Sequence, residues 1–283
     1  MSAASRVPAN TNSTRSAHFR TLSGKGLVWG AVLAVVIFTI GAWKHSGEVM
    51  AASPVASAIV VLIILFILAD RQAENEFFKR FADAHEMTHS AHWSLYELTP
   101  LLGGGDRRKC THWMENESAG IGWYTFEVRR DNGDKPDTWE SHDFTVSMVD
   151  IGEIGTRRFQ GIYLRRKRGI FERMDSDSNW LSKHHLKKVE LESAAFGDRY
   201  ELWAEQDQDD LALRQLFAPT FQVWLTEHPL EPGFELRAGT LVVFIPGHCG
   251  EAGKLDFLLM AATEISKRIR LELTEAAQAG RPV

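Results

Sequence analysis

Two long uncharged stretches stand near the start of the chain. Residues 26–43 and residues 49–69 contain no charged side chain. At a rise of about 1.5 Å per residue, helices of these lengths cover roughly 27 and 31 Å, which matches a hydrocarbon core about 30 Å thick. The pattern predicts a transmembrane hairpin over residues 26–69, with one helix near 26–43 and a second near 52–69.

The apolar residues that follow are spaced alternately four and three apart, as on one face of a helix. This stripe predicts a juxtamembrane helix over residues 70–99, with a face that a second helix can pack against as in a coiled coil. Pro100 and the run Gly103–Gly105 end the pattern, and we expect the glycines to form a flexible joint. The stripe consists of Phe77, Phe81, Ala84, Thr88, Ala91, Leu95 and Leu98.

From about residue 118 the pattern changes to that of strands mixed with helices. Without regular alternation of strand and helix, this predicts an α+β fold with a mostly antiparallel sheet, in one domain over residues 118–275. We expect strands over 122–130, 141–151, 157–169, 188–193 and 198–206, and a hairpin over 234–246. We expect helices over 177–189, 211–228 (broken by Pro219) and 253–278.

Charge gives the expected orientation. The basic tail, residues 1–25, carries four cationic residues and no acid, and the positive-inside rule then places the N-terminus in the cytoplasm. Two spans return the chain to the same side, so the sequence predicts a multi-pass protein of a bacterial-type inner membrane with both termini cytoplasmic. The two cysteines, Cys110 and Cys249, fit a reducing compartment.

The net charge of −5 divides unevenly. The tail contributes +4 and residues 26–69 contribute zero, so residues 70–283 carry −9. An acidic domain argues against nucleic acid as the main partner. The expected partners are the lipid bilayer and either an unknown protein or a second copy bound through the 77–98 helix. The basic cluster 165–168 is either a lipid-phosphate contact or a solvated strand end.

The stretch His85-Glu86-Met87-Thr88-His89 has the spacing of a zinc-peptidase helix. On a helix, His85 and His89 lie on one face and could bind zinc, while Glu86 could act as the general base on metal-bound water. A third protein ligand is also required. His92 lies about 10.5 Å of helical rise from His85, too far for one straight helix to bring all three to one ion. The simpler interpretation is that these histidines are packing residues beside the apolar stripe; a metal- or proton-sensing stripe is a further hypothesis.

The segment from Val189 to Leu225 resembles the C-terminal signature of a family of bacterial membrane proteins with two N-terminal spans and a cytoplasmic domain of unknown function. The matching features are Val189 to Glu192, Phe196, Tyr200 to Trp203, Asp207 to Asp210, and Leu216 to Pro219. The resemblance implies the architecture and assigns no reaction. The expected function is therefore a membrane-anchored cytoplasmic binding or scaffold domain, with no catalytic, cofactor or metal residue assigned. The alternative is a membrane-bound zinc peptidase that uses His85, Glu86 and His89.

Overall fold

The computed structural model describes Asn10 and residues 53–95, 97–131, 137–152, 158–167 and 186–279. The chain divides into two compact units. Unit 1 comprises Met1–His85 with Gly250–Ala252, and unit 2 comprises Glu86–Cys249 with Gly253–Val283.

Unit 1 contains one long helix, α3, which spans Ser53–Ala84. Its last three turns carry an aromatic cluster in which Phe77 meets Phe78 edge-on at 5.0 Å between ring centroids. Phe81 stacks on Phe77 at 6.4 Å, and all three rings are buried. The spacing of four between Phe77 and Phe81 brings both rings to the same side of the helix.

The expected transmembrane hairpin stays a prediction. The first span lies outside the described residues, and the second falls on the start of α3, where the backbone alone is described as far as Phe66. In the part of the chain that the structure describes, no helix is both long enough and apolar enough to cross a membrane.

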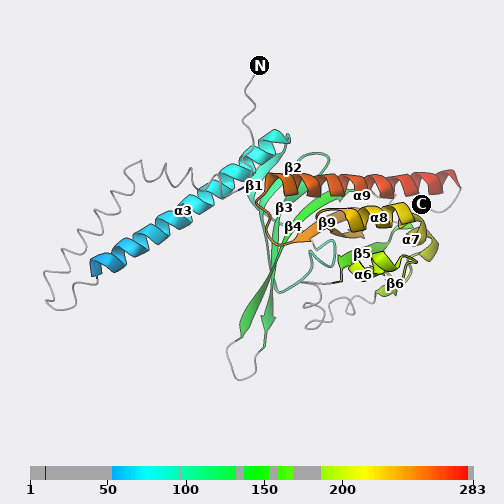
Figure 1. Ribbon diagram of the computed structural model, residues 1–283, viewed down its shortest axis with the longest axis horizontal. Coiled ribbons are helices and arrows are strands. Elements are labelled where there is room, and N and C mark those ends of the chain that lie inside the picture. Colours follow the sequence, from blue (N-terminus) through cyan, green and yellow to red (C-terminus); the bar gives the residue numbers. More distant parts are fainter. Residues whose placement is uncertain are drawn as a thin grey trace, which may run out of the picture. The chain divides into compact units, whose positions relative to one another are not determined.

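Unit 2 is built on a nine-stranded sheet in which every neighbouring pair of strands is antiparallel (Figure 1). The order across the sheet is β1-β2-β3-β4-β9-β8-β5-β7-β6. This confirms the predicted α+β class with a large antiparallel sheet. The strands are β1 Thr88–Trp93, β2 Arg107–Glu115, β3 Gly120–Arg130, β4 Thr138–Asp150, β5 Gly161–Arg166, β6 Lys187–Val189, β7 Tyr200–Ala204, β8 Gly233–Arg237 and β9 Thr240–Pro246.

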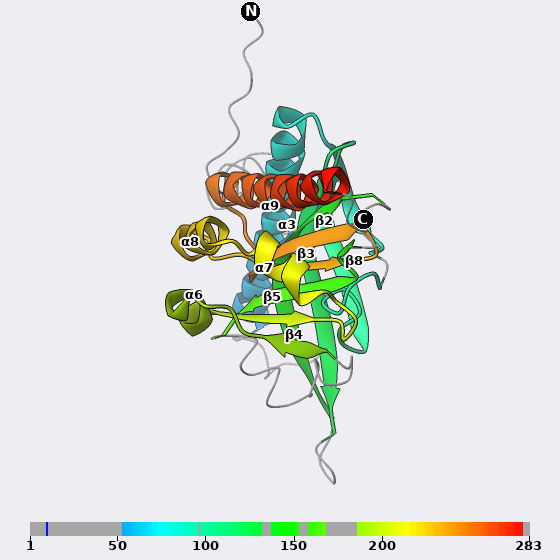
Figure 2. The ribbon, with the colours of Figure 1, turned by 90° about the vertical axis from the view of Figure 1, so that its right-hand side faces the viewer.

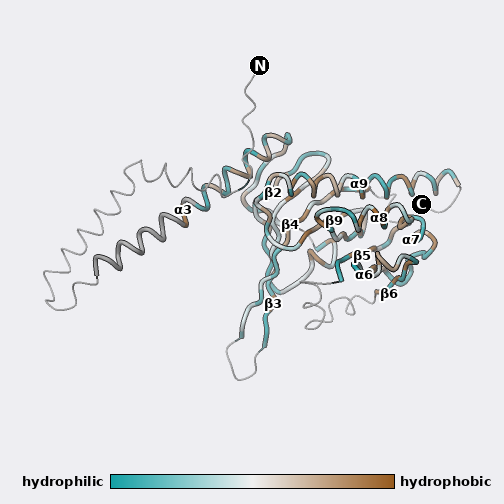
Figure 3. The backbone as a smooth tube through the Cα atoms, viewed as in Figure 1, coloured by the Kyte–Doolittle hydropathy of each residue, from teal (hydrophilic) through white to brown (hydrophobic). Residues whose placement is uncertain are grey.

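Helices α7 (Asp210–Leu216), α8 (Pro219–Glu227) and α9 (Ala252–Gln278) lie together along one side of the sheet (Figures 1 and 2). Arg268 of α9 donates to the carbonyl of Gln215 at 3.0 Å, which joins α9 to α7. Arg270 donates to the carbonyl of Asp150 at 2.6 Å and ties α9 to the end of β4. Hydrophobic and hydrophilic residues alternate along α9, as its amphipathic sequence predicts (Figure 3).

The other face of the sheet carries an aromatic core around Tyr124, Phe126, Phe144 and Phe244. Leu101 and Leu102 close this core from the segment between β1 and β2. The segment is held by hydrogen bonds, including one from the Gly103 amide to the Thr99 carbonyl at 2.8 Å. The flexible joint expected at Gly103–Gly105 is therefore wrong, because burial of the two leucines fixes this turn.

The helix predicted over residues 70–99 is also wrong in its second half. The helix ends at Ala84, and Glu86 has a φ of 55°, in the left-handed region that stops an α-helix. Residues 88–93 form β1, which pairs with β2 from Thr88 opposite Glu115 to Trp93 opposite Cys110. Pairing with a strand that lies elsewhere in the sequence outweighs the local helical spacing.

Two further boundaries differ from the prediction. The sheet begins with β1 and β2, so the folded domain starts near residue 86 and not at 118. Residues 187–189, where the predicted helix 177–189 overlaps the predicted strand 188–193, form the strand β6, while the rest of that predicted helix lies outside the described residues except for Leu186. Residues 194–199 form the short helix α6 (Ala194–Arg199), so the strand predicted from 198 begins only after this helix.

Candidate functional site

The zinc-peptidase motif does not form the helix that its chemistry requires. His85 directly follows the last turn of α3, where its amide bonds to the carbonyls of Phe81 and Ala82. Glu86 and the strand residue His89 lie beyond the end of the helix, so the two imidazoles are not on one helical face. Among the described residues, no group of three or more histidine, cysteine or acidic side chains is arranged to hold a metal ion. The predicted zinc arrangement of His85, Glu86 and His89 is therefore wrong in its geometry.

His89 belongs instead to a row of rings that crosses three strands. It stacks on His112 of β2 at 5.8 Å, and His112 meets Trp123 of β3 edge-on at 5.0 Å. Trp123 then stacks on His248, after β9, at 4.7 Å with the ring planes 1° apart. Sequence spacing gave no sign of this row, because it is made by strand pairing across β1, β2 and β3.

Burial favours the neutral form of two histidines in this row, His112 and His248. It lowers the pKa of His112 to about 4, and the neighbouring charges of His89, His248, His92 and Lys109 lower it further. Burial also lowers the pKa of His248, although Asp143 acts in the opposite direction. His112 sits at a β-bulge between Thr111 and Met114 with a φ of 51°, a backbone conformation uncommon for histidine. His112 is therefore neutral at ordinary pH.

Thr125, Asp143 and His248 contain the residue types of a nucleophile, an acid and a base. The Thr125 hydroxyl donates to Asp143 Oδ1 at 2.7 Å and lies 2.9 Å from His248 Nε2. That same ring nitrogen is 3.5 Å from Asp143 Oδ1. A catalytic base must face the nucleophile with one nitrogen and its orienting acid with the other, so this arrangement does not activate Thr125.

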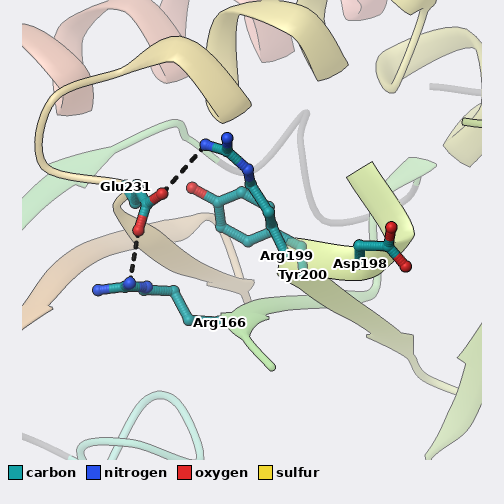
Figure 4. A pocket seen from close by; sticks show the side chains of 5 residues that line it. All are labelled: Arg166, Asp198, Arg199, Tyr200 and Glu231. Atoms are coloured by element: carbon teal, nitrogen blue, oxygen red, sulfur yellow. Dashed lines mark hydrogen bonds and ion pairs between the residues drawn. The ribbon is translucent and has the colours of Figure 1, made fainter. Parts of the chain in front are cut away.

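A charged cleft of about 300 Å³ lies at the opposite half of the sheet. Pairing of β5 with β7 sets Arg166 opposite Tyr200, and the end of α6 places Arg199 beside it. Figure 4 shows the Glu231 carboxylate between the two guanidinium groups. Arg166 Nη2 is 2.5 Å from Glu231 Oε2, and Arg199 Nη1 is 3.1 Å from Glu231 Oε1. Two cations thus converge on one carboxylate in an open cleft.

Helix α8 holds two residues of the cleft, Arg199 and Tyr200, in place. Arg199 also donates to the carbonyl of Thr226 at 2.6 Å, and the buried Tyr200 hydroxyl donates to the carbonyl of Leu225 at 3.1 Å. Burial raises the pKa of Tyr200, so its hydroxyl remains a donor at ordinary pH. Glu231 follows α8 in a turn with a φ of 42°. Arg199 and Tyr200 are therefore both held by hydrogen bonds to backbone carbonyls of α8.

The basic cluster predicted at residues 165–168 does not present one cationic surface. Arg165 is buried and pairs with Glu201 at 3.1 Å, and Arg166 points into the cleft. Lys167 donates to the carbonyl of Gly197 at 2.9 Å, and Arg168 lies outside the described residues. Burial would raise the pKa of Glu201, but its bond to Lys188 and the charge of Arg165 lower it overall. Arg166 is thus the member of this cluster that reaches the candidate site.

A second cleft of about 290 Å³ adjoins the first and shares Asp198 and Tyr200 with it. Its walls mix apolar side chains with charged ones, including Leu191 and Phe196 beside Lys188. Residues of α6 line both clefts. Sequence reasoning missed Arg199 and Glu231, and the one local signal was the Pro- and Gly-containing turn around Glu231.

Comparisons with known proteins add little to this geometry. No protein-family model matches the chain, and no curated protein matches it. Among solved structures, the chain is similar to the crystal structure of the mycobacterial trehalose monomycolate transport factor A, TtfA, with 11% sequence identity and a TM-score of 0.42. The alignment covers 70% of this chain and 94% of that chain. A likeness at this level assigns no function.

Proposed function

We propose that this chain is a membrane-anchored binding domain at the cytoplasmic face of a bacterial-type inner membrane. In this proposal, the Arg166–Arg199 cleft holds an acidic group of the ligand, a carboxylate or a phosphate. The observation that carries the proposal is the convergence of two guanidinium groups on one carboxylate in an open cleft. Planar guanidinium groups are well suited to carboxylate and phosphate oxygens.

The sequence supports the anchor. Residues 26–43 and 49–69 carry no charge and are long enough to cross a bilayer as helices. The backbone of the second stretch is helical from Ser53. The cationic tail of residues 1–25 favours a cytoplasmic N-terminus, and an even number of spans then leaves the sheet domain on the same side. The resemblance to membrane proteins with paired N-terminal spans is consistent with this arrangement.

Partial exposure supports the exchange of Glu231 for an external acid. The side chains of Arg166 and Arg199 are 40% and 52% exposed, and that of Glu231 is 28% exposed. Ion pairs at such positions contribute only about 1 kcal/mol or less, so an external phosphate or carboxylate can compete with Glu231. In this respect the internal carboxylate marks the position of the ligand's acidic group.

Calorimetric titration of the detergent-purified full chain tests the cleft. Inorganic phosphate and a short-chain phosphatidylglycerol are used as separate probes, since a free anion and a lipid headgroup share this chemistry. We expect binding that Arg199→Gln weakens and that Arg214→Gln leaves unchanged. Arg214 is the matched control because it is 54% exposed and faces the exposed Glu192. The assignment of the cleft would be overturned if neither probe binds, or if the two variants lose the same amount of binding.

A further inference from the structure

The two edge strands of the nine-stranded sheet differ in how well they are protected against pairing with another chain. Soluble proteins guard exposed edge strands by making them short or by placing lysine or proline on them. The edge strand β6 is three residues long and carries Lys187 and Lys188. The other edge strand, β1, has six residues, THSAHW, with neither a lysine nor a proline. Trp93 at its end is 41% exposed. The β1 edge therefore has the features of a strand that pairs with another chain.

Charged side chains of opposite sign lie near the two ends of β1. Glu86 and Glu117 are exposed near the Thr88 end, where Glu115 lies directly opposite Thr88. Lys109 is exposed beyond the Trp93 end, because Trp93 lies opposite Cys110. At that end Arg107 and Arg108 are matched by Glu127 at 3.8 Å and Glu97 at 2.5 Å. One end of the edge is thus acidic, and the cationic Lys109 lies at the other end, about 17 Å away along the strand.

This arrangement is complementary to a second copy of itself. When two identical strands pair antiparallel about a two-fold axis, the Thr88 end of one meets the Trp93 end of the other. The acidic end of each copy then lies beside the basic end of the other, which gives two equivalent favourable contacts. A charged residue in the middle of β1 would instead meet its own copy, and β1 carries no acidic or basic residue other than histidine.

We propose that β1 pairs antiparallel with β1 of a second copy, so that two nine-stranded sheets become continuous. The pairing rests on the proposed membrane anchor. Six residues on each side are fewer than the roughly 20–30 of a standard interface, and confinement to a membrane raises the effective concentration of the two copies. Self-association thus involves the same region as the sequence predicted, through strand pairing in place of a coiled coil.

A single-cysteine scan in isolated membranes tests the pairing. Cysteine replaces, one at a time, Thr88, Ser90, Ala91 and His92. In an antiparallel two-fold pair, residues near the axis face their own copies at about 4.5–5.5 Å between Cα atoms, within disulfide range. We expect oxidised dimers at one or two adjacent positions. The wild type is one control, because Cys110 and Cys249 are buried, and Lys188→Cys on β6 is the other. Cross-linking no greater than at Lys188→Cys would overturn the proposal.

Charge-reversal variants test whether the acidic end of one β1 strand lies beside Lys109 of the other copy, whatever the pairing register. Glu117→Lys and Lys109→Glu should each lower the dimer yield of the best cysteine variant roughly tenfold, because two symmetry-related contacts change at once. The combined exchange should restore the yield. Two singles without effect, or a double variant no better than the singles, contradict the two-fold arrangement.

Membrane retention of the same samples separates this inference from the proposed function. If the chain is retained but does not cross-link, the β1 pairing is wrong and the anchor stands. If the chain washes off the membrane, the anchor is wrong. The cysteine scan is then repeated with the full chain at high concentration in solution, where a positive or negative result decides the pairing by itself.

Discussion

The carboxylate of Glu235 accepts a hydrogen bond from the backbone amide of Leu101 at 2.8 Å inside the sheet core. The side chain lies on the inner strand β8, and the bond fastens the segment that carries Leu101 and Leu102. Burial raises the pKa of Glu235 to about 7 from 4.5, although the hydrogen bond from the Leu101 amide acts in the opposite direction. A titrating group thus holds a turn that the sequence suggested was flexible.

Glu235→Gln should change how stability depends on pH. Between pH 4.5 and 7, the folded chain holds a proton on Glu235 that the unfolded chain has released, so the free energy of unfolding falls as pH rises. A shift of this size corresponds to about 3 kcal/mol across that window. The variant removes this loss, and its urea unfolding should show a free energy that rises more steeply with pH than that of the wild type. Parallel pH profiles for variant and wild type would contradict the assignment.

His112→Asn should have the opposite effect. The pKa of His112 is lowered to about 4, so between pH 6.5 and 4 the unfolded chain takes up a proton that the folded chain does not. The histidine therefore costs about 3 kcal/mol of stability as the pH falls through this window. Asparagine also tolerates the left-handed backbone at this position. In urea unfolding, the variant should lose less stability than the wild type between pH 6.5 and 4.

The effects of Glu235 and His112 have opposite slopes over the shared range from about pH 4.5 to 6.5. In the wild type they should largely cancel, and each single variant should reveal the slope of the other group. The double variant Glu235→Gln, His112→Asn should return to a profile close to that of the wild type within this range. A double variant that follows either single variant would show that one of the two pKa shifts is not present.

Glu231→Gln should strengthen the binding of an anion in the cleft. Removal of the internal carboxylate leaves Arg166 and Arg199 without their shared acid, and phosphate then binds without competition. Since two exposed ion pairs are lost, we expect roughly a tenfold gain in affinity for inorganic phosphate by calorimetry. Glu127→Gln is the control, because Glu127 is 37% exposed, pairs loosely with Arg107 at 3.8 Å, and lies on β3 in the other half of the sheet. An equal gain in the control would point to general electrostatics in place of the cleft.

Gly120→Ala should destabilise the sheet. A Cβ at Gly120 would overlap the indole ring of Trp113, which itself stacks on Trp93 of β1 at 6.3 Å. Overpacking of this kind costs about 1–3 kcal/mol. Gly197→Ala is the matched control, since a Cβ there meets nothing within 4 Å. Urea midpoints should fall for the first variant and stay level or rise slightly for the second; equal midpoints would contradict the contact.

The local sequence pattern was sufficient to predict those strands and helices whose two ends are marked by turn or capping residues. The β3–β4 and β8–β9 pairs and the long α9 were predicted from alternation, turn residues and amphipathic spacing. The failure at residues 85–98 has a physical cause. Thr88 and Ala91 fit a helical stripe by spacing, but they form the strand β1 through pairing with β2, whose charged sequence Arg107–Glu115 and central bulge gave no clear strand pattern.

The candidate site lay beyond sequence reasoning for a related reason. Arg166 and Arg199 become neighbours because β5 pairs with β7, and Glu231 reaches them from the turn after α8. No fixed spacing joins these three residues in the sequence. The zinc motif shows the reverse case, in which a local spacing matched a known pattern but the helix that gives the spacing its meaning ended at Ala84.

Alkaline carbonate extraction of membranes that contain the full chain tests the central claim most directly. We expect the wild type to stay in the membrane pellet, and a variant with two lysines in each proposed span (Val35→Lys, Val36→Lys, Leu62→Lys, Leu65→Lys) to be released, because each lysine at the centre of a span costs about 2.5–3.5 kcal/mol. Met260→Lys, Leu271→Lys is the control, since both side chains are exposed on α9. Retention of the wild type and the control, with release of the variant that carries lysines in both spans, is the result that the anchor predicts. Release of the wild type would contradict it.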